Sequence, residues 1–519
     1  MLRMPQTDEV SQDGRSRVFI LAVAFATVVL CSALAWHGPS RFWDSASYAA
    51  GADSIANGHG LSTEMVPIFS DFRATEFIER GSRVPYTDFP AGFTIVVGAV
   101  GVVTGAKVAL MVVALASTGV LVAAIMWATG VSRRRVRQWS ADDRWRAAAV
   151  VVFAVGVVVL PSYQWMLRAG LSEPTFCAVV VTVAALLLAA DRRRDPLAVV
   201  LAGLAGCIRF VGLPVIAVPA LIMWRDRGLR RSWAWVTVAV APSALNVAWA
   251  SAVGGGHRIG LRDVSLADVR VALHAMVGWA SNRYGGGLAL FHSGSWPVWW
   301  GFLLAAVWGL AVGAAMLGQL LGRQWLPRPM QITFAMAGVL TLSLAAGIVL
   351  FDAFVLPDNR LLLPAGVLTL TGLLWSAADK LDGRWLLAVV SLWVVSASEP
   401  WTLRMMSDPV RSDDLIAAVG DAQVVVSDDS DAVWWETDVP AAPLPPRRSY
   451  LTGDAIDQEA ELRELPCLLA AADGVIVVVA PPFFDQSWSA RLDVMVDDGH
   501  LTRQNFGDIV RYTPTGQGC

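Results

Sequence analysis

Asp44 is the residue of this chain whose position first suggests chemistry. It lies a few residues beyond the first long apolar run, at the start of a segment with helical spacing. Tyr48 and Ala52 share one face of that segment, and the pair Asn57-Gly58 is a stop signal. Aspartate is favoured as a helix N-cap, and a carboxylate within reach of a hydroxyl group can also act as a general base. Spacing alone favours the cap.

Two arginines are candidates for binding an anion. Arg209 is far from the other arginine clusters, at the turn of a short apolar pair, and Arg360 follows Asp358. An arginine at membrane depth is costly and usually faces a cavity or a partner, although Arg209 could also reach the lipid headgroups. Arg360 could bind a phosphate with its forked donors or pair with Asp358.

Glu173 stands between Ser172 and Pro174 before an apolar run. Serine as N-cap and proline in the first turn are ordinary features of a helix start, and a glutamate there suits the helix dipole. A structural role at the helix start therefore explains Glu173 about as well as a functional role does.

The elements that must position these residues are membrane helices. Hydrophobic residues make up 55% of the 519-residue chain, and many apolar runs approach the roughly 20 residues needed to cross a bilayer. The first run is longer than the core of a signal peptide, so we expect an uncleaved span. Candidate spans lie at about 18–36, 106–130, 147–161, 172–190, 232–253, 297–321, 330–351, 360–378 and 385–400.

Arginine clusters mark the cytoplasmic side of these spans. Residues 196–224 have arginines on both flanks, which predicts two short or broken helices around Gly206 to Gly212. The sequence thus predicts a polytopic α-helical membrane protein with about eleven transmembrane helices and a cytoplasmic N-terminus. Its membrane domain would cover residues 1–400, including an outer loop at 37–92.

The segment 401–519 has a different composition, with twenty acidic residues, eight arginines and no lysine. Valine-rich runs alternate with helical stretches, which predicts a small extracytoplasmic α/β domain. Cys467 and Cys519 would then lie in an oxidising compartment, where a disulfide between them could persist. No cysteine or histidine cluster has metal-ligand spacing, so we expect neither a metal nor a cofactor. The net charge of −3 gives no indication of nucleic-acid binding.

Four motifs resemble the GT-C superfamily, whose polytopic glycosyltransferases use polyprenyl-phosphate sugars. The likeness is to bacterial relatives of protein O-mannosyltransferases and of the lipid A aminoarabinose transferase, and it covers roughly residues 15–400. Ala91 stands where the family has a second proline, and Leu361 where it has an aromatic residue. The motifs are Trp43 to Tyr48 running to Asn57 through Leu61, Phe89 to Phe93, Leu171 to Phe176, and Arg209 to Gly212 with Asn359 to Pro364.

The resemblance implies an inverting transfer at the extracytoplasmic face of the plasma membrane. Asp44 would be the catalytic base, and Arg360 or Arg209 would bind the donor phosphate. The donor would be a polyprenyl-phosphate sugar, and the acceptor a lipid, a glycan or a protein. The remaining motif residues would shape the site: Tyr48, Glu173, Pro90 and Gly92.

Two other functions remain open at this point. A lipid or glycan transporter or flippase also needs buried charges, but inverted repeats are not evident and the candidate charges cluster at the outer rim. The other is a non-catalytic protein of cell-envelope assembly. The sequence leaves the sugar open among mannose, glucose, arabinose and galactofuranose.

Overall fold

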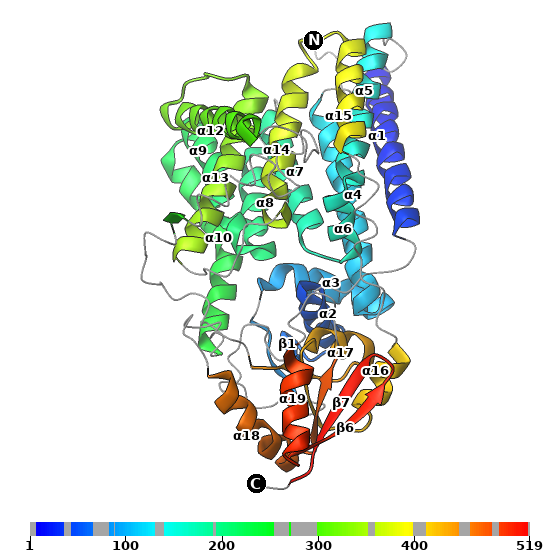
Figure 1. Ribbon diagram of the computed structural model, residues 1–519. Coiled ribbons are helices and arrows are strands. Elements are labelled where there is room, and N and C mark those ends of the chain that lie inside the picture. Colours follow the sequence, from blue (N-terminus) through cyan, green and yellow to red (C-terminus); the bar gives the residue numbers. More distant parts are fainter. Residues whose placement is uncertain are drawn as a thin grey trace. The chain divides into compact units, whose positions relative to one another are not determined.

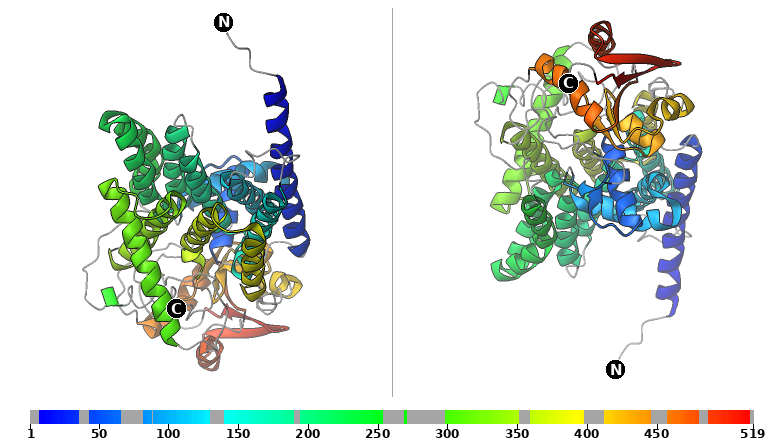
Figure 2. Two further views of the ribbon diagram at one scale, coloured as in Figure 1. Left: turned by 90° about the horizontal axis from the view of Figure 1, so that it is seen from above. Right: turned by 90° about the horizontal axis from the view of Figure 1, so that it is seen from below.

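The computed structural model describes most of the chain. The described residues are 7–35, 43–65, 82–87, 89–129, 140–189, 194–253, 269–270, 298–350, 359–397, 412–445, 457–479 and 487–516. The chain forms two compact units (Figures 1 and 2). The first contains residues 1–39, 111–248 and 259–405, and the second contains residues 40–110, 249–258 and 406–519.

The first unit is built from helices. They are α1 (Thr7–Leu34), α4 (Ala106–Ala128), α5 (Ala141–Val159), α6 (Pro161–Arg168), α7 (Glu173–Leu188), α8 (Asp195–Ile208), the 3-10 helix η3 (Phe210–Ile216), α9 (Ala217–Arg227), α10 (Leu229–Ala252), α12 (Val298–Leu321), α13 (Arg328–Leu350), α14 (Asn359–Ala377) and α15 (Gly383–Ala397). The first turn of α4 and the last residues of α10 belong to the second unit.

Helices coincide with the predicted spans, but fewer than eleven satisfy a length and hydropathy test. Four helices in the described part of the chain are long and apolar enough to cross a membrane, or five if the bent pair α5–α6 is one span. Six further apolar helices have 10–17 residues. The count of eleven crossings therefore stays a prediction.

The segment between α7 and α9 is broken at Arg209, inside the predicted interval. Helix α8 ends at Ile208, Arg209 has an extended backbone, and η3 then leads into α9. A side chain at Gly212 could not fit there, because its Cβ would lie 2.5 Å from the ring of Phe176 and 2.6 Å from the carbonyl oxygen of Ala205. This close approach holds the turn after Arg209 against α7 and α8.

The second unit begins with two packed helices, α2 (Trp43–Ala56) and α3 (Ala91–Thr104). Between them, β1 (Ser62–Thr63) pairs antiparallel with β2 (Val84–Pro85). Glycines allow the two helices to approach closely. A Cβ at Gly51 of α2 would lie 2.9 Å from Thr94 of α3 as well as 2.7 Å from the ring of Tyr86, and one at Gly98 of α3 would lie 2.8 Å from Ile55 of α2.

The C-terminal part of this unit contains a five-stranded mixed sheet with the order β4-β3-β5-β7-β6. Strands β4, β3 and β5 are parallel, and β7 and β6 continue the sheet antiparallel. These strands are β3 (Val424–Ser427), β4 (Ala441–Pro443), β5 (Gly474–Val478), β6 (Leu501–Phe506) and β7 (Ile509–Pro514). Two of them, β3 and β5, lie where valine-rich runs predicted strands.

Alternate side chains of β3 and β5 enter two separate apolar clusters, as the two-residue period of a strand requires. One cluster includes leucines of α18 (Gln458–Ala471) and α19 (Ser487–Asp497). The other includes apolar residues of α16 (Ser412–Val419) and α17 (Ser430–Thr437). Helices therefore cover both faces of the parallel strands, which explains why these strands consist of continuous apolar residues.

Candidate functional site

Asp44 is the second residue of α2 and lies in its first turn. The prediction of an N-cap is wrong, because the backbone is already helical at Trp43. The carboxylate of Asp44 still belongs to the first turn of the helix, where the helix dipole favours negative charge. Asp44 is 8% exposed. A buried carboxylate is costly unless its surroundings compensate it, and the start of α2 provides part of that compensation.

Tyr48 lies one helical turn after Asp44 and therefore on the same face of α2. Its ring is 1% exposed. It packs against Phe89 at a centroid distance of 4.8 Å and meets Phe93 edge-on at 4.9 Å. The second motif is thereby brought against the first, although Tyr48 and Phe89 are 41 positions apart in the chain.

The predicted site-shaping residues Pro90 and Gly92 stand at the start of α3. Pro90 is buried and occupies the N-cap position, with φ −56° and ψ 130°. Proline has no N–H group to leave unpaired there and fixes φ near this value. Gly92 is half-buried in the first turn. Together they direct the chain so that Phe93 can reach Tyr48.

Sequence reasoning missed a polar group that connects the residues next to β1 and β2 with α2. A nitrogen of Arg83 lies 2.7 Å from the carboxylate of Glu64, and the same guanidinium donates to the hydroxyl of Ser54 on α2. Both charged side chains are about a quarter exposed. No sequence spacing relates Glu64 to Arg83. Their meeting depends on the pairing of β1 with β2.

In the first unit, Arg209 and Glu173 form an ion pair. Arg209 Nη1 lies 2.7 Å from Glu173 Oε1, and the two side chains are 14% and 0% exposed. The same nitrogen donates to the hydroxyl of Ser172 at 3.1 Å. Ser172 stands at the N-cap position of α7, but its side chain makes no capping hydrogen bond to the helix. The predicted cap is therefore replaced by a hydrogen bond to Arg209.

The side chain of Arg209 is thus directed at a fully buried carboxylate in the first unit. Removing either partner would leave a buried charge uncompensated. Because α8 ends just before Arg209 and α7 begins at Glu173, the pair joins the third motif to the first half of the fourth.

Arg360 is the second residue of α14, but its side chain lies outside the described residues, as does Asp358. Its role at a phosphate stays a prediction. Cys467 lies on α18 and is disulfide-bonded, whereas Cys519 lies outside the described residues. Among the residues that the structure describes, no group of three or more histidine, cysteine, aspartate or glutamate side chains could hold a metal ion.

No protein-family model and no curated protein matches this chain. Solved structures that resemble it include ArnT from Cupriavidus metallidurans, bound to undecaprenyl phosphate and in the apo state. Each shares 14% sequence identity with a TM-score of 0.46, and the match covers 95% of this chain and 97% of that chain.

Another similar structure is the Archaeoglobus fulgidus oligosaccharyltransferase in complex with zinc and sulfate. It shares 12% identity with a TM-score of 0.43, and the match covers 88% of this chain and 67% of that chain.

Proposed function

We propose that this protein is a membrane glycosyltransferase that moves a sugar from a polyprenyl-phosphate donor to an acceptor hydroxyl group. The observation that carries the proposal is the buried carboxylate of Asp44, held in the first turn of α2 beside the Tyr48–Phe89–Phe93 cluster. A buried carboxylate within hydrogen-bond reach of an incoming hydroxyl group can accept its proton.

The reaction takes place in one displacement. The acceptor oxygen attacks the anomeric carbon while Asp44 takes the hydroxyl proton, and the bond between that carbon and the phosphate oxygen breaks. The polyprenyl phosphate leaves with the electron pair as an anion. Attack from the side opposite the leaving group inverts the anomeric centre.

The leaving phosphate needs a positive partner, because negative charge develops on it as the bond breaks. Arg209 and Arg360 are the two candidates. Arg209 is supported by its ion pair with Glu173, which fixes the orientation of the guanidinium. In this role Glu173 does not react but positions Arg209.

The protein would act at the plasma membrane as a multi-pass protein with a cytoplasmic N-terminus. Asp44 and the C-terminal sheet would lie on the extracytoplasmic side, where polyprenyl-phosphate sugars serve as donors and nucleotide sugars are not expected. The acceptor would be a lipid, a glycan or a protein. Neither a metal nor a cofactor has a part in this mechanism.

The test is a transfer assay with the purified full-length protein in lipid nanodiscs. A panel of radiolabelled polyprenyl-phosphate mannose, glucose, arabinose and galactofuranose is incubated with membrane extract, and the anomeric configuration of the product is determined. The proposal predicts transfer from one of these donors with inversion. Retention of configuration, transfer from a nucleotide sugar alone, or movement of the labelled lipid across a bilayer without transfer would contradict it.

A further inference from the structure

Lys107 is one of only two lysines in the chain, in which arginine supplies 38 of the 40 basic side chains. It is the second residue of α4, directly after the corner at Gly105 that ends α3. Gly105 has a φ of +79°, which glycine adopts readily. Lys107 is thus attached to the end of the helix that packs against α2.

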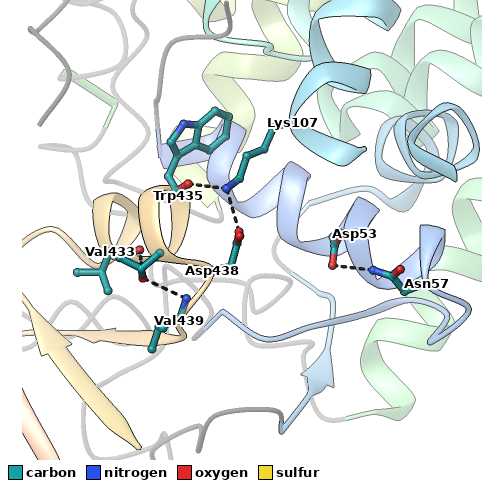
Figure 3. Close-up of polar contacts among 8 residues, drawn as sticks. Asp53, Asn57, Lys107, Val433, Trp435, Asp438 and Val439 are labelled. Atoms are coloured by element: carbon teal, nitrogen blue, oxygen red, sulfur yellow. Dashed lines mark hydrogen bonds and ion pairs between the residues drawn. The ribbon is translucent and has the colours of Figure 1, made fainter. Parts of the chain in front are cut away.

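The ammonium group of Lys107 contacts the end of α17 in the C-terminal part of the second unit (Figure 3). It donates to the carbonyl oxygen of Trp435 and lies 2.8 Å from a carboxylate oxygen of Asp438. It also lies 5.3 Å and 5.6 Å from the ring centroids of Trp434 and Trp435. A lysine ammonium carries three donors on a compact charge, which suits a site with several partners around one point.

The backbone at the end of α17 places the groups that Lys107 contacts. Asp438 follows the helix in the left-handed conformation, with φ +54°, and its N–H group bonds to the carbonyl of Trp434. This leaves the carbonyl of Trp435 directed at Lys107, at the helix end where the dipole favours a cation. Asp438 has a side chain that is 74% exposed, so its ion pair alone contributes little. The carbonyl and the two indoles are the larger part of the contact.

Two further contacts connect the same parts of the second unit. Helix α17 touches α2, which carries Asp44. Val84 of β2 packs against the apolar cluster that includes residues of α18 and α19. Because Arg83, next to Val84, bonds to Ser54 of α2, the C-terminal sheet is connected to α2 from two sides.

We infer that Lys107 is a positioning residue through which the C-terminal sheet and its helices hold α2, and with it Asp44, in place. The consequence for turnover rests on the proposed function, whereas the holding of α2 does not. The C-terminal segment then positions the proposed base, although it supplies none of the groups proposed to react.

The variant Lys107→Met removes the charge and keeps a side chain of similar length. Lys380→Met is the matched control, since Lys380 is the other lysine and is exposed near the end of α14. Hydrogen exchange is measured on both full-length variants in nanodiscs. Lys107→Met is expected to speed exchange in α17 and α2 by about tenfold or more, and Lys380→Met to leave both unchanged. Unchanged exchange in α2 of Lys107→Met would overturn the inference.

A second measurement reports on the lysine itself. Reductive methylation with carbon-13 formaldehyde labels both lysines and keeps their charge. The rings of Trp434 and Trp435 should shift the methyl signal of Lys107 upfield of that of Lys380, and each signal is assigned by its absence from the corresponding variant. The same shift for both lysines would contradict the contact with the indoles.

Turnover distinguishes positioning from a merely structural contact. Lys107→Met should lower kcat for sugar transfer about tenfold or more and leave KM for the donor nearly unchanged, because Asp44 and not donor binding is affected. Faster exchange in α2 with unchanged kcat would overturn the positioning role. If the unchanged protein transfers no sugar at all, the proposed function fails, and the exchange measurement still decides whether Lys107 holds α2.

Discussion

At the scale of single residues, burial separates the charged groups that the sequence singled out. Glu173 is completely buried and pairs with Arg209, and Asp44 is nearly buried in the first turn of α2. The sequence could indicate these residues because charged side chains are rare beside long apolar runs. It could not indicate that Ser172 bonds to Arg209 instead of capping α7, since that depends on the break of the chain after α8.

The ion pair allows a test that separates stability from function. Arg209→Met leaves Glu173 buried without its partner and should destabilise the protein by about 3–5 kcal/mol. The double variant Arg209→Met with Glu173→Met removes both charges and should recover most of that stability, as measured by thermal unfolding in detergent. Transfer should remain low in both variants, because the leaving phosphate lacks its arginine. Recovery of transfer in the double variant would show that Arg209 is structural only.

At the scale of elements, the packing of α2 against α3 depends on glycines. Gly51→Ala should lower the unfolding temperature, since the new Cβ would lie 2.7 Å from the ring of Tyr86. Overpacking of this kind costs about 1–3 kcal/mol, more than the roughly 1 kcal/mol that alanine contributes through helix propensity. The control is Gly313→Ala in α12, where a Cβ would meet no atom within 4 Å. Equal effects of the two substitutions would contradict the packing described for Gly51.

The end of β3 provides a pH-dependent test. Burial raises the pKa of Asp428 from 3.8 to about 6, although its carboxylate accepts a hydrogen bond from the N–H group of Val479. The folded state therefore binds this proton more tightly than the unfolded state. The stabilisation that protonation of Asp428 gives the folded state is complete below about pH 4 and is lost as the pH rises to about 6.

The variant Asp428→Asn removes this titration while its amide oxygen can still accept the bond from Val479. It should stabilise the sheet at pH 7 by up to about 3 kcal/mol and show little gain at pH 4. Hydrogen-exchange protection of β3 and β5 in the full-length protein, corrected for intrinsic rates, measures the difference. A gain in protection over the unchanged protein that is no larger at pH 7 than at pH 4 would count against the raised pKa.

Elements with a strong local pattern were predictable, and contacts between distant segments were not. The valines of β3 and β5 predicted strands because both faces of those strands are buried. The break near Arg209 followed from arginines on both flanks of a segment too short for two full helices. By contrast, the bond between Ser54 and Arg83 depends on how α2, β1 and β2 meet.

At the scale of the whole molecule, residues 40–110 and 406–519 form one compact unit although more than 290 residues separate them. The predicted boundary at residue 400 followed the change in composition, which carries no information on such a contact. Lys107 and Asp438 are 331 positions apart and lie within 2.8 Å. The segment that carries the proposed base therefore belongs to the same compact unit as the C-terminal sheet.

The measurement that tests the central claim most directly is the rate of sugar transfer by Asp44→Asn. Asp53→Asn is the matched control, because Asp53 lies on the same helix and accepts a hydrogen bond from Asn57 at its exposed end. Transfer from the polyprenyl-phosphate sugar identified with the unchanged protein is followed for both variants in nanodiscs, together with their unfolding temperatures. Loss of a general base predicts that Asp44→Asn is slower by about 10²–10⁴-fold while it remains folded, and that Asp53→Asn keeps its rate. Full transfer by a folded Asp44→Asn variant would contradict the account.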